Sequence, residues 1–470
     1  MSSAQPASTW RGIFRDLPRE HGFEPLRVEG RVPDSLRGTL YRCGPARFGI
    51  GGEPYLHWFD ADGAVTAVRF GSPGVVRASG APPAPQSAPE ARTTPGSTPD
   101  VEGAVRVLDT RWLRKERKAN RQLYRSYAQL GRGWRRWLTL PKNPANISVI
   151  PWDGQLLALW EAGLPIAVDR DTLETRGETT LGGQIGPTFS AHPHRVNNTL
   201  FNFGIHYGPK FSLDLYADAK RIGNVPLPRP TLIHDFIPTA KHLIFFCPPI
   251  RLRLARLLAG IAPFDDNLAW EPSHGTEIVV VPLADPTKPI RFTVDPFFQW
   301  HFVNAWEERD GIIKVDYIPY DDFETNRWFG RAPYDPPTLP PASRYARATL
   351  DLAARRMHTE TLSTAFCEFP AFDAQRDATW FLCFDDGLPP SLCRFDPSTR
   401  AHRNVPLGEH AVPSEPCVAG DFVLSLVYDG ARDASYVAVI DAARPEDGPV
   451  ARIWFDHAIP FPFHGAWEAM

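Results

Sequence analysis

Four of the fourteen histidines lie in segments rich in apolar and aromatic residues. Burial disfavours the charged imidazolium, and the neutral imidazole is the form that ligates a metal ion. Taken singly, a histidine in such a segment is more often a core residue with one hydrogen bond. Taken together, the four are candidate ligands of a single metal ion, provided that the fold brings them to one place. In the segments SAHPH, LIHDF, QWHFV and PFHGA they are His192, His234, His301 and His464.

The elements that carry these histidines are far apart in the sequence, unlike the i, i+4 pairs of a helical zinc site. A β-propeller can unite such residues, because the innermost strand of each blade faces a central channel. No clean repeat of fixed period identifies a propeller from the sequence alone. Short apolar runs between Gly-, Pro- and Asp-rich turns do predict the strands of a sandwich, barrel or propeller, for example residues 154–160, 276–281, 312–317, 422–428 and 436–440.

Composition narrows the classes of protein further. The chain has 470 residues, which allows one large closed fold or two domains. With 51 Lys and Arg against 54 Asp and Glu its net charge is −3, which argues against a general nucleic-acid binder. The 49 prolines and 35 glycines favour short strands and turns over an α-solenoid.

The sequence also bears on the compartment. No apolar run reaches the roughly 18 residues of a transmembrane helix, and no apolar signal segment stands at the start. The six cysteines form no C-x-x-C pair, which favours reduced thiols over a disulfide framework or a zinc site. These features predict a cytoplasmic protein.

Two segments interrupt the regular alternation of apolar runs and turns. Residues 79–100 contain six prolines and no large apolar side chain, so we expect a flexible, Pro-rich insert. Residues 111–136 carry ten Lys or Arg and one Glu, interleaved with Trp, Tyr and Leu, and predict a basic amphipathic helical segment.

Several spaced motifs resemble those of the carotenoid cleavage oxygenases. They are the stretch from Arg37 to Phe70 (RGTLYRCGPARFGIGGEPYLHWFDADGAVTAVRF), LLALWEAGLP, the four histidine segments, CEFP at residues 367–370 and PSEP at residues 413–416. The resemblance runs in order from Arg37 to Trp467, which is almost the whole chain. It departs from the family pattern at Cys43, where the family has Asn, and at Ala61, where the family has Gly.

This resemblance implies an all-β fold, a seven-bladed β-propeller with a dome of helices and loops over an axial iron site. Residues 1–470 would then form a single domain. The family's four metal ligands map onto the four histidines named above, which would hold a non-haem Fe(II) ion. Imidazoles suit Fe(II), and four of them leave open positions on a six-coordinate ion for dioxygen.

The resemblance also implies three buried glutamates that orient the histidines. Glu161 would pair with His234, Glu368 with His301, and Glu415 with His464, which fixes each tautomer and raises ligand basicity. A surface position is the usual one for glutamate, but the apolar neighbours of all three argue for burial, namely Leu159, Trp160, Phe369 and Pro416.

Other motif residues receive smaller roles. Ile147 in ANISV stands where the family usually has Thr beside the open metal position, so we expect an equally crowded but less polar site. His57, Asp60 and Asp235 are expected to be structural. Asn304 and Glu307 are expected to form hydrogen bonds near the metal-bearing strand and not to be ligands.

Three activities occur within the resemblance: cleavage of carotenoids or apocarotenoids, cleavage of stilbenoids, and isomerohydrolysis of retinyl esters. Stilbenoid cleavers resemble one another in a Lys directly before the first buried Glu, and this chain has Trp160 there. An indole cannot stabilise a phenolate as an ammonium does. The PDPCK signature of the isomerohydrolases is absent as well. We therefore expect an Fe(II)-dependent dioxygenase acting on a carotenoid or apocarotenoid, with a stilbenoid substrate as the alternative.

Two further alternatives concern partners. A catalytically idle propeller that binds a protein or small ligand is the alternative from a different functional class, and the presence of all seven metal-site residues argues against it. Residues 111–137 and 248–264 combine basic and apolar side chains, so they could dock on an anionic membrane beside the tunnel mouth or pack within the dome. The two interpretations have equal weight at this point.

Overall fold

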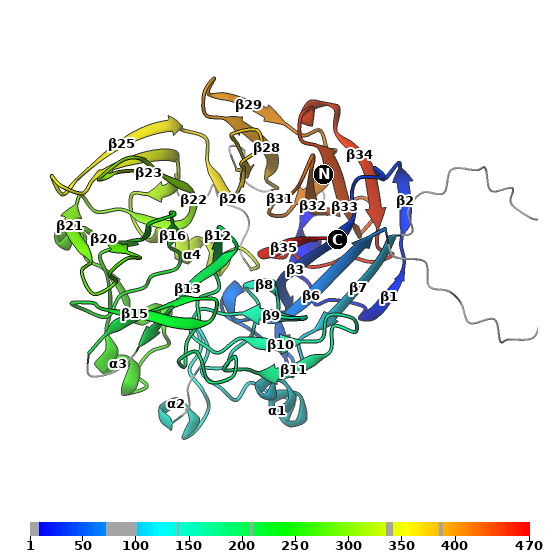
Figure 1. Ribbon diagram of the computed structural model, residues 1–470. Coiled ribbons are helices and arrows are strands. Elements are labelled where there is room, and N and C mark those ends of the chain that lie inside the picture. The colour runs from blue at the N-terminus through cyan, green and yellow to red at the C-terminus, as the bar shows by residue number, and fades with distance from the viewer. Residues whose placement is uncertain (1–8, 72–100, 139–140, 207–209, 335–341, 385–388) are drawn as a thin grey trace, which may run out of the picture.

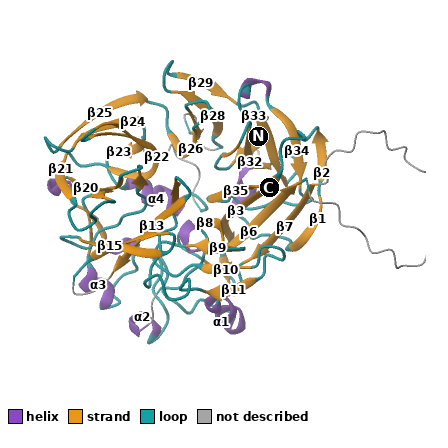
Figure 2. Ribbon diagram, in the orientation of Figure 1, coloured by secondary structure: helices purple, strands orange, loops and turns teal. Residues whose placement is uncertain are grey.

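The computed structural model describes residues 9–71, 101–138, 141–206, 210–334, 342–384 and 389–470. Its strands form seven sheets of four or more strands, arranged as blades around a central axis (Figure 1). This arrangement is a seven-bladed β-propeller, as the motifs predicted. Strands dominate the molecule and helices are confined to connections (Figure 2). The predicted Pro-rich insert at residues 79–100 lies outside the described residues.

One blade closes the ring by joining the two ends of the chain. Its order is β1-β7-β6-β3-β35. The C-terminal strand pairs antiparallel with β3, and Cys43 lies opposite His464. The bounds are β1 His21–Pro25, β7 Val101–Val107, β6 Asp62–Phe70, β3 Gly38–Arg47 and β35 His464–Ala469.

The next three blades follow in chain order, and each has four strands. The first comprises β8 Ser148–Trp152, β9 Gln155–Leu159, β10 Ile166–Val168 and β11 Thr175–Glu178. The second comprises β12 His194–Val196, β13 Thr199–His206, β14 Ser212–Ala217 and β15 Lys220–Pro226. The third comprises β16 Ile237–Pro238, β17 His242–Cys247, β20 Thr276–Pro282 and β21 Ile290–Val294.

The remaining three blades complete the ring. One holds β22 Phe298–Arg309, β23 Ile312–Tyr320, β24 Tyr345–Asp351 and β25 Arg356–Ser363. Another holds β26 Cys367–Asp373, β27 Ala378–Cys383, β28 Ser391–Asp396 and β29 Ala401–Asn404. The last holds β2 Arg27–Gly30, β34 Pro449–Trp454, β33 Ala434–Asp441, β32 Phe422–Asp429, β30 Ala411–Pro413 and β31 Cys417–Ala419. Two-stranded ribbons lie in connections, β4 Gly49–Ile50 with β5 Glu53–Pro54 and β18 Ile250–Leu252 with β19 Leu268–Trp270.

The apolar runs form strands that are buried on both faces, because each blade packs against its neighbours. In β20 the four consecutive residues from Ile278 to Val281 are fully buried. A continuous apolar run, without alternation, is what burial on both faces requires. All five runs singled out in the sequence lie in strands, namely β9, β20, β23, β32 and β33.

The helices are short and lie between strands. They are α1 Arg111–Ala119, α2 Arg135–Leu138, α3 Leu254–Leu258 and α4 Glu324–Arg331, with 3-10 turns η1 Thr9–Phe14, η2 Trp58–Asp60, η3 Asp265–Asn267, η4 Pro272–His274 and η5 Pro445–Asp447. No helix among the described residues is long and apolar enough to span a membrane.

The prediction of a helical segment over residues 111–136 is wrong for its middle part. Asn120 ends α1 in the left-handed conformation, with φ of 47°. The Glu116 carboxylate then accepts a hydrogen bond from the Leu123 backbone N–H at 2.8 Å, which holds the chain in a turn after the helix. Residues 120–134 are therefore turns and bends.

Candidate metal centre

The four candidate histidines meet at the propeller axis. Each offers one ring nitrogen to a cluster in which all four nitrogens lie within 4.8 Å of one another. They come from the inner ends of four blades: His192 precedes β12, His234 precedes β16, His301 lies in β22, and His464 begins β35. These strands surround the centre of the ring (Figure 1).

Three of the imidazoles place Nδ1 against a carboxylate, His301 and His464 through hydrogen bonds and His234 through a close contact. The pairs are those expected from the motifs: His234 to Glu161 at 2.5 Å, His301 to Glu368 at 2.5 Å, and His464 to Glu415 at 2.6 Å. A carboxylate at Nδ1 fixes the tautomer and leaves the Nε2 lone pair available at the axis.

His192 differs from the other three. Its Nε2 is buried and has no hydrogen-bond partner among the described residues. Burial lowers the pKa of His192 well below its ordinary value, and the neighbouring imidazoles lower it further, so the ring is neutral at neutral pH. A buried neutral nitrogen without a partner is costly unless something else binds it.

Two residues that the sequence analysis did not assign donate hydrogen bonds to the carboxylates beside the histidines. The fully buried Arg42 donates to Glu415 Oε2 at 2.8 Å and to the Phe463 carbonyl at 2.9 Å. The Tyr320 hydroxyl donates to Glu368 Oε1 at 2.8 Å. Arg42 lies within the Arg37–Phe70 motif, which was the available signal, whereas nothing in the sequence around Tyr320 marks it.

An apolar pocket lies against the histidine cluster. The imidazoles of His234, His301 and His464 form one wall, and its other lining residues are Phe59, Ile147, Trp300, Phe329, Phe369 and Phe463. Ile147 thus lies beside the cluster, where the motif comparison placed it. The pocket is small, with a volume of about 20 Å³, and it places apolar and aromatic side chains next to the imidazole rings.

The remaining motif residues lie outside the cluster. Asp235 accepts hydrogen bonds from the Phe302 backbone N–H at 2.9 Å and from His194 Nε2 at 2.8 Å, which ties neighbouring blades together. His57 caps η2. Asp60 accepts from a backbone N–H of the 120–134 connection. Glu307 accepts from the Thr239 hydroxyl and from His242.

The chemistry of this donor set fits a metal ion. Four imidazoles converge, and His301 Nε2 and His464 Nε2 lie 3.2 Å apart. Imidazole binds Zn, Cu, Fe and Ni. The unpartnered nitrogen of His192 and the three orienting carboxylates are both accounted for if an ion lies between the rings.

Comparisons with known proteins identify the family of the chain. The family model described as retinal pigment epithelial membrane protein matches residues 14–469. The chain is 28% identical to an apocarotenoid-15,15'-oxygenase of Synechocystis sp., covering 97% of this chain and 96% of the relative. It is 26% identical to an isoeugenol monooxygenase of Pseudomonas putida, covering 94% of each. It is 25% identical to a lignostilbene-alpha,beta-dioxygenase isozyme of Sphingomonas paucimobilis, covering 99% of this chain and 98% of that one.

Solved structures show the same likeness. A variant of Synechocystis apocarotenoid oxygenase superposes with a TM-score of 0.84 at 25% identity, covering 98% of both chains. The cobalt-substituted form of that enzyme superposes with a TM-score of 0.83 over the same share. The family match spans nearly the whole sequence, and the chain therefore belongs to the retinal pigment epithelial membrane protein family, which is the carotenoid oxygenase family indicated by its motifs.

Proposed function

We propose that this protein is an Fe(II)-dependent dioxygenase that cleaves a double bond of a carotenoid or apocarotenoid. Its two products would be carbonyl compounds, each taking one oxygen atom of dioxygen. The observation that carries the proposal is the apolar, aromatic pocket placed directly against four convergent imidazoles. His192, His234, His301 and His464 would hold the iron.

A bound Fe(II) ion would supply the one-electron chemistry that activates dioxygen. The chain's own residues orient the imidazoles and exclude water. Glu161, Glu368 and Glu415 hold three imidazoles by their Nδ1 protons. The aromatic walls would exclude water and orient the reacting double bond beside the cluster, which would confine the substrate near its reactive geometry.

Two features of the chain favour a polyene over a stilbenoid. Apart from its imidazoles, the pocket is lined by hydrocarbon and indole side chains. Trp160 stands before Glu161, where an ammonium group would be needed to stabilise a phenolate. A stilbenoid is the alternative substrate, because two relatives are named as a lignostilbene dioxygenase and a resveratrol cleavage oxygenase.

Product analysis tests the proposal. Purified protein is incubated with a panel of carotenoids, apocarotenals and hydroxystilbenes, and the products are identified by chromatography and mass spectrometry. We expect aldehyde products from at least one carotenoid or apocarotenal. Cleavage of the hydroxystilbenes alone would favour the alternative substrate class, and no cleavage at all with iron bound would favour a non-catalytic binding module.

We further propose that the protein is cytoplasmic and docks on membranes through a surface formed by Trp134, Trp137, Leu258 and Ile261. All four side chains are more than half exposed. Trp137 Nε1 donates to the Ala259 carbonyl at 3.0 Å, which joins the two segments that the sequence analysis singled out. Side chains of α3 are not buried, which argues against packing within a dome. Neighbouring arginines could meet anionic headgroups.

Flotation with anionic liposomes tests this surface. The double change Leu258→Ser and Ile261→Ser should weaken binding by about 3 kcal/mol or more if both side chains insert fully. Because both are exposed, the melting temperature should stay unchanged. Normal flotation with a lowered melting temperature would show instead that these side chains pack within the protein.

A further inference from the structure

The segment from Lys142 to Ile147 (KNPANI) joins two buried clusters. Every residue in it is buried, and it leads directly into β8. Its first residue, Lys142, lies in a group of charged side chains, and its last, Ile147, lines the apolar pocket beside the histidine cluster. A buried segment with a polar partner at nearly every residue has little freedom to move. A displacement of one end therefore displaces the other end as well.

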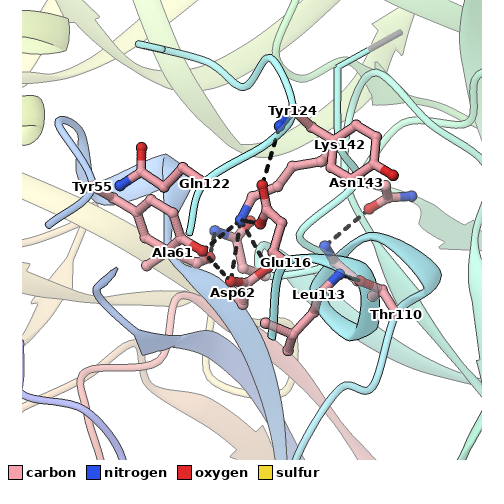
Figure 3. Close-up of polar contacts among 12 residues, drawn as sticks. Tyr55, Ala61, Asp62, Thr110, Leu113, Glu116, Gln122, Tyr124, Lys142 and Asn143 are labelled. Carbon is pink, nitrogen blue, oxygen red and sulfur yellow. Dashed lines mark hydrogen bonds and ion pairs between the residues drawn. The ribbon is translucent and has the colours of Figure 1, made fainter. Parts of the chain in front are cut away.

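The Lys142 end is held by an ion cluster remote from the pocket. Lys142 Nζ donates to the Tyr55 hydroxyl at 2.8 Å, to Asp62 at 3.0 Å and to Glu116 at 3.3 Å (Figure 3). The Tyr55 hydroxyl donates in turn to Asp62 at 2.6 Å. Side chains from β6, α1 and the segment itself are thereby tied at one point.

The Ile147 end contributes to the candidate metal site twice. Its side chain lines the pocket beside three of the histidines. Its backbone carbonyl accepts a hydrogen bond from the His464 N–H at 3.0 Å, and its own N–H donates to the Leu159 carbonyl at 3.2 Å. A displacement of this residue would move a pocket wall and a candidate ligand together.

Asn146 links Ile147 to a second lining residue of the pocket, Phe59. Its side chain is fully buried, and Nδ2 donates to the Phe59 carbonyl at 3.0 Å and to the Ala61 carbonyl at 2.7 Å. Phe59 also lines the pocket, where its ring contacts Trp300 edge to face. The side-chain amide of Asn146 therefore holds the backbone of Phe59 and Ala61, and Ile147 follows Asn146 directly in the chain.

We propose that Asn146 is a positioning residue, which sets the placement of Phe59 against Ile147 and thereby the double bond presented to the metal. The inference rests on the function proposed above. It requires both hydrogens of the Nδ2 group, because a carboxylate cannot donate to the two carbonyls and a hydroxyl can donate to one only.

Kinetics and product analysis of Asn146→Ala test this role, with an asymmetric all-trans apocarotenal dispersed in detergent as the probe. Loss of both hydrogen bonds should lower kcat by about 10 to 100-fold, because orientation at the reacting centre is lost. KM should change by less than about threefold, because the rest of the substrate contacts are kept. The ratio of products from neighbouring double bonds should shift as well.

Asn267 provides a matched control. It is also fully buried, its Nδ2 also donates to two backbone carbonyls, those of Ala262 and Pro263, and it lies outside the pocket lining. Asn267→Ala should lower the melting temperature to a similar extent but leave the product ratio unchanged. If Asn146→Ala does not fold, Asn146→Ser, which keeps one donor, should show an intermediate shift.

A double-mutant cycle with Phe59→Leu decides whether Asn146 acts through the pocket wall. In the Phe59→Leu background, Asn146→Ala should add little to the change in product ratio, since coupled residues are not additive. Additive effects, or an unchanged product ratio and kcat in both Asn146 variants, would overturn the inference alone. A wild-type protein that cleaves no polyene would overturn the inference together with the proposed function.

Discussion

Two buried clusters, one around Lys142 and one around the four axial histidines, contain carboxylates. They differ in the group that the carboxylates surround. Around Lys142 the cation is a side chain of the protein, and its ammonium group contacts Tyr55, Asp62 and Glu116 (Figure 3). At the propeller axis the carboxylates face outward from four imidazoles, and the nitrogens that point inward meet one another.

The difference lies in which groups the protein itself supplies to satisfy the buried polar atoms of each cluster. A buried ion pair is tolerated when every charge has partners. The axial cluster brings four imidazole nitrogens together, and His192 Nε2 has no hydrogen-bond partner in the described part of the chain. Four convergent imidazoles, three of them with a carboxylate at Nδ1, form a donor set that fits a metal ion.

The largest expected effect is loss of the metal. We expect one iron per chain in the wild-type protein and little or none in His234→Ala, because one of four converging imidazoles is removed. Metal analysis of both purified proteins measures this. Full iron occupancy and normal activity in the variant would remove His234 from the ligand set.

Breaking the lysine cluster should affect stability instead of metal binding. Lys142→Met leaves Asp62 and Glu116 buried without their cation, which should reduce the free energy of unfolding by about 3 to 5 kcal/mol. Lys241→Met is the matched control, because that exposed lysine also faces two carboxylates, those of Glu307 and Asp310. The control should cost at most about 1 kcal/mol. Equal effects in denaturant titrations would contradict the account of the buried cluster.

A smaller change weakens the axial cluster without removing a ligand. Glu161→Gln keeps an acceptor for His234 Nδ1 but removes the negative charge, so metal affinity or activity should fall by about 10 to 100-fold while the fold is kept. Competition with a chelator measures the affinity. Unchanged iron retention and turnover would show that Glu161 does not support the metal.

The smallest effect concerns a carboxylate that belongs to neither cluster. Burial raises the pKa of Asp265 to about 7. A carboxyl group with a raised pKa in the folded state destabilises the protein as pH rises from its unfolded value, near 4, to about 7. Asp265→Asn should therefore raise the melting temperature by a few degrees at pH 8 and leave it unchanged at pH 4. A gap of equal size at both pH values would contradict this.

The two clusters also show what the sequence can and cannot predict. The convergence of the axial histidines and glutamates could be predicted because each lies in a motif of several residues, and the strands could be predicted because apolar runs form blades buried on both faces. The partners of Lys142 come from three separate segments, and no local pattern signals such a contact. The same holds for Tyr320. The basic residues of 111–136 predicted one long helix, but Asn120 and the turn held by Glu116 end it.

Titration of metal-free protein with Fe(II), followed by the initial rate of apocarotenal cleavage, tests whether the axial site is an iron-dependent catalytic centre. We expect activity to rise in proportion to bound iron and to stop rising at one ion per chain. Cleavage that does not depend on iron, or full iron occupancy without cleavage of any carotenoid or apocarotenal, would contradict it.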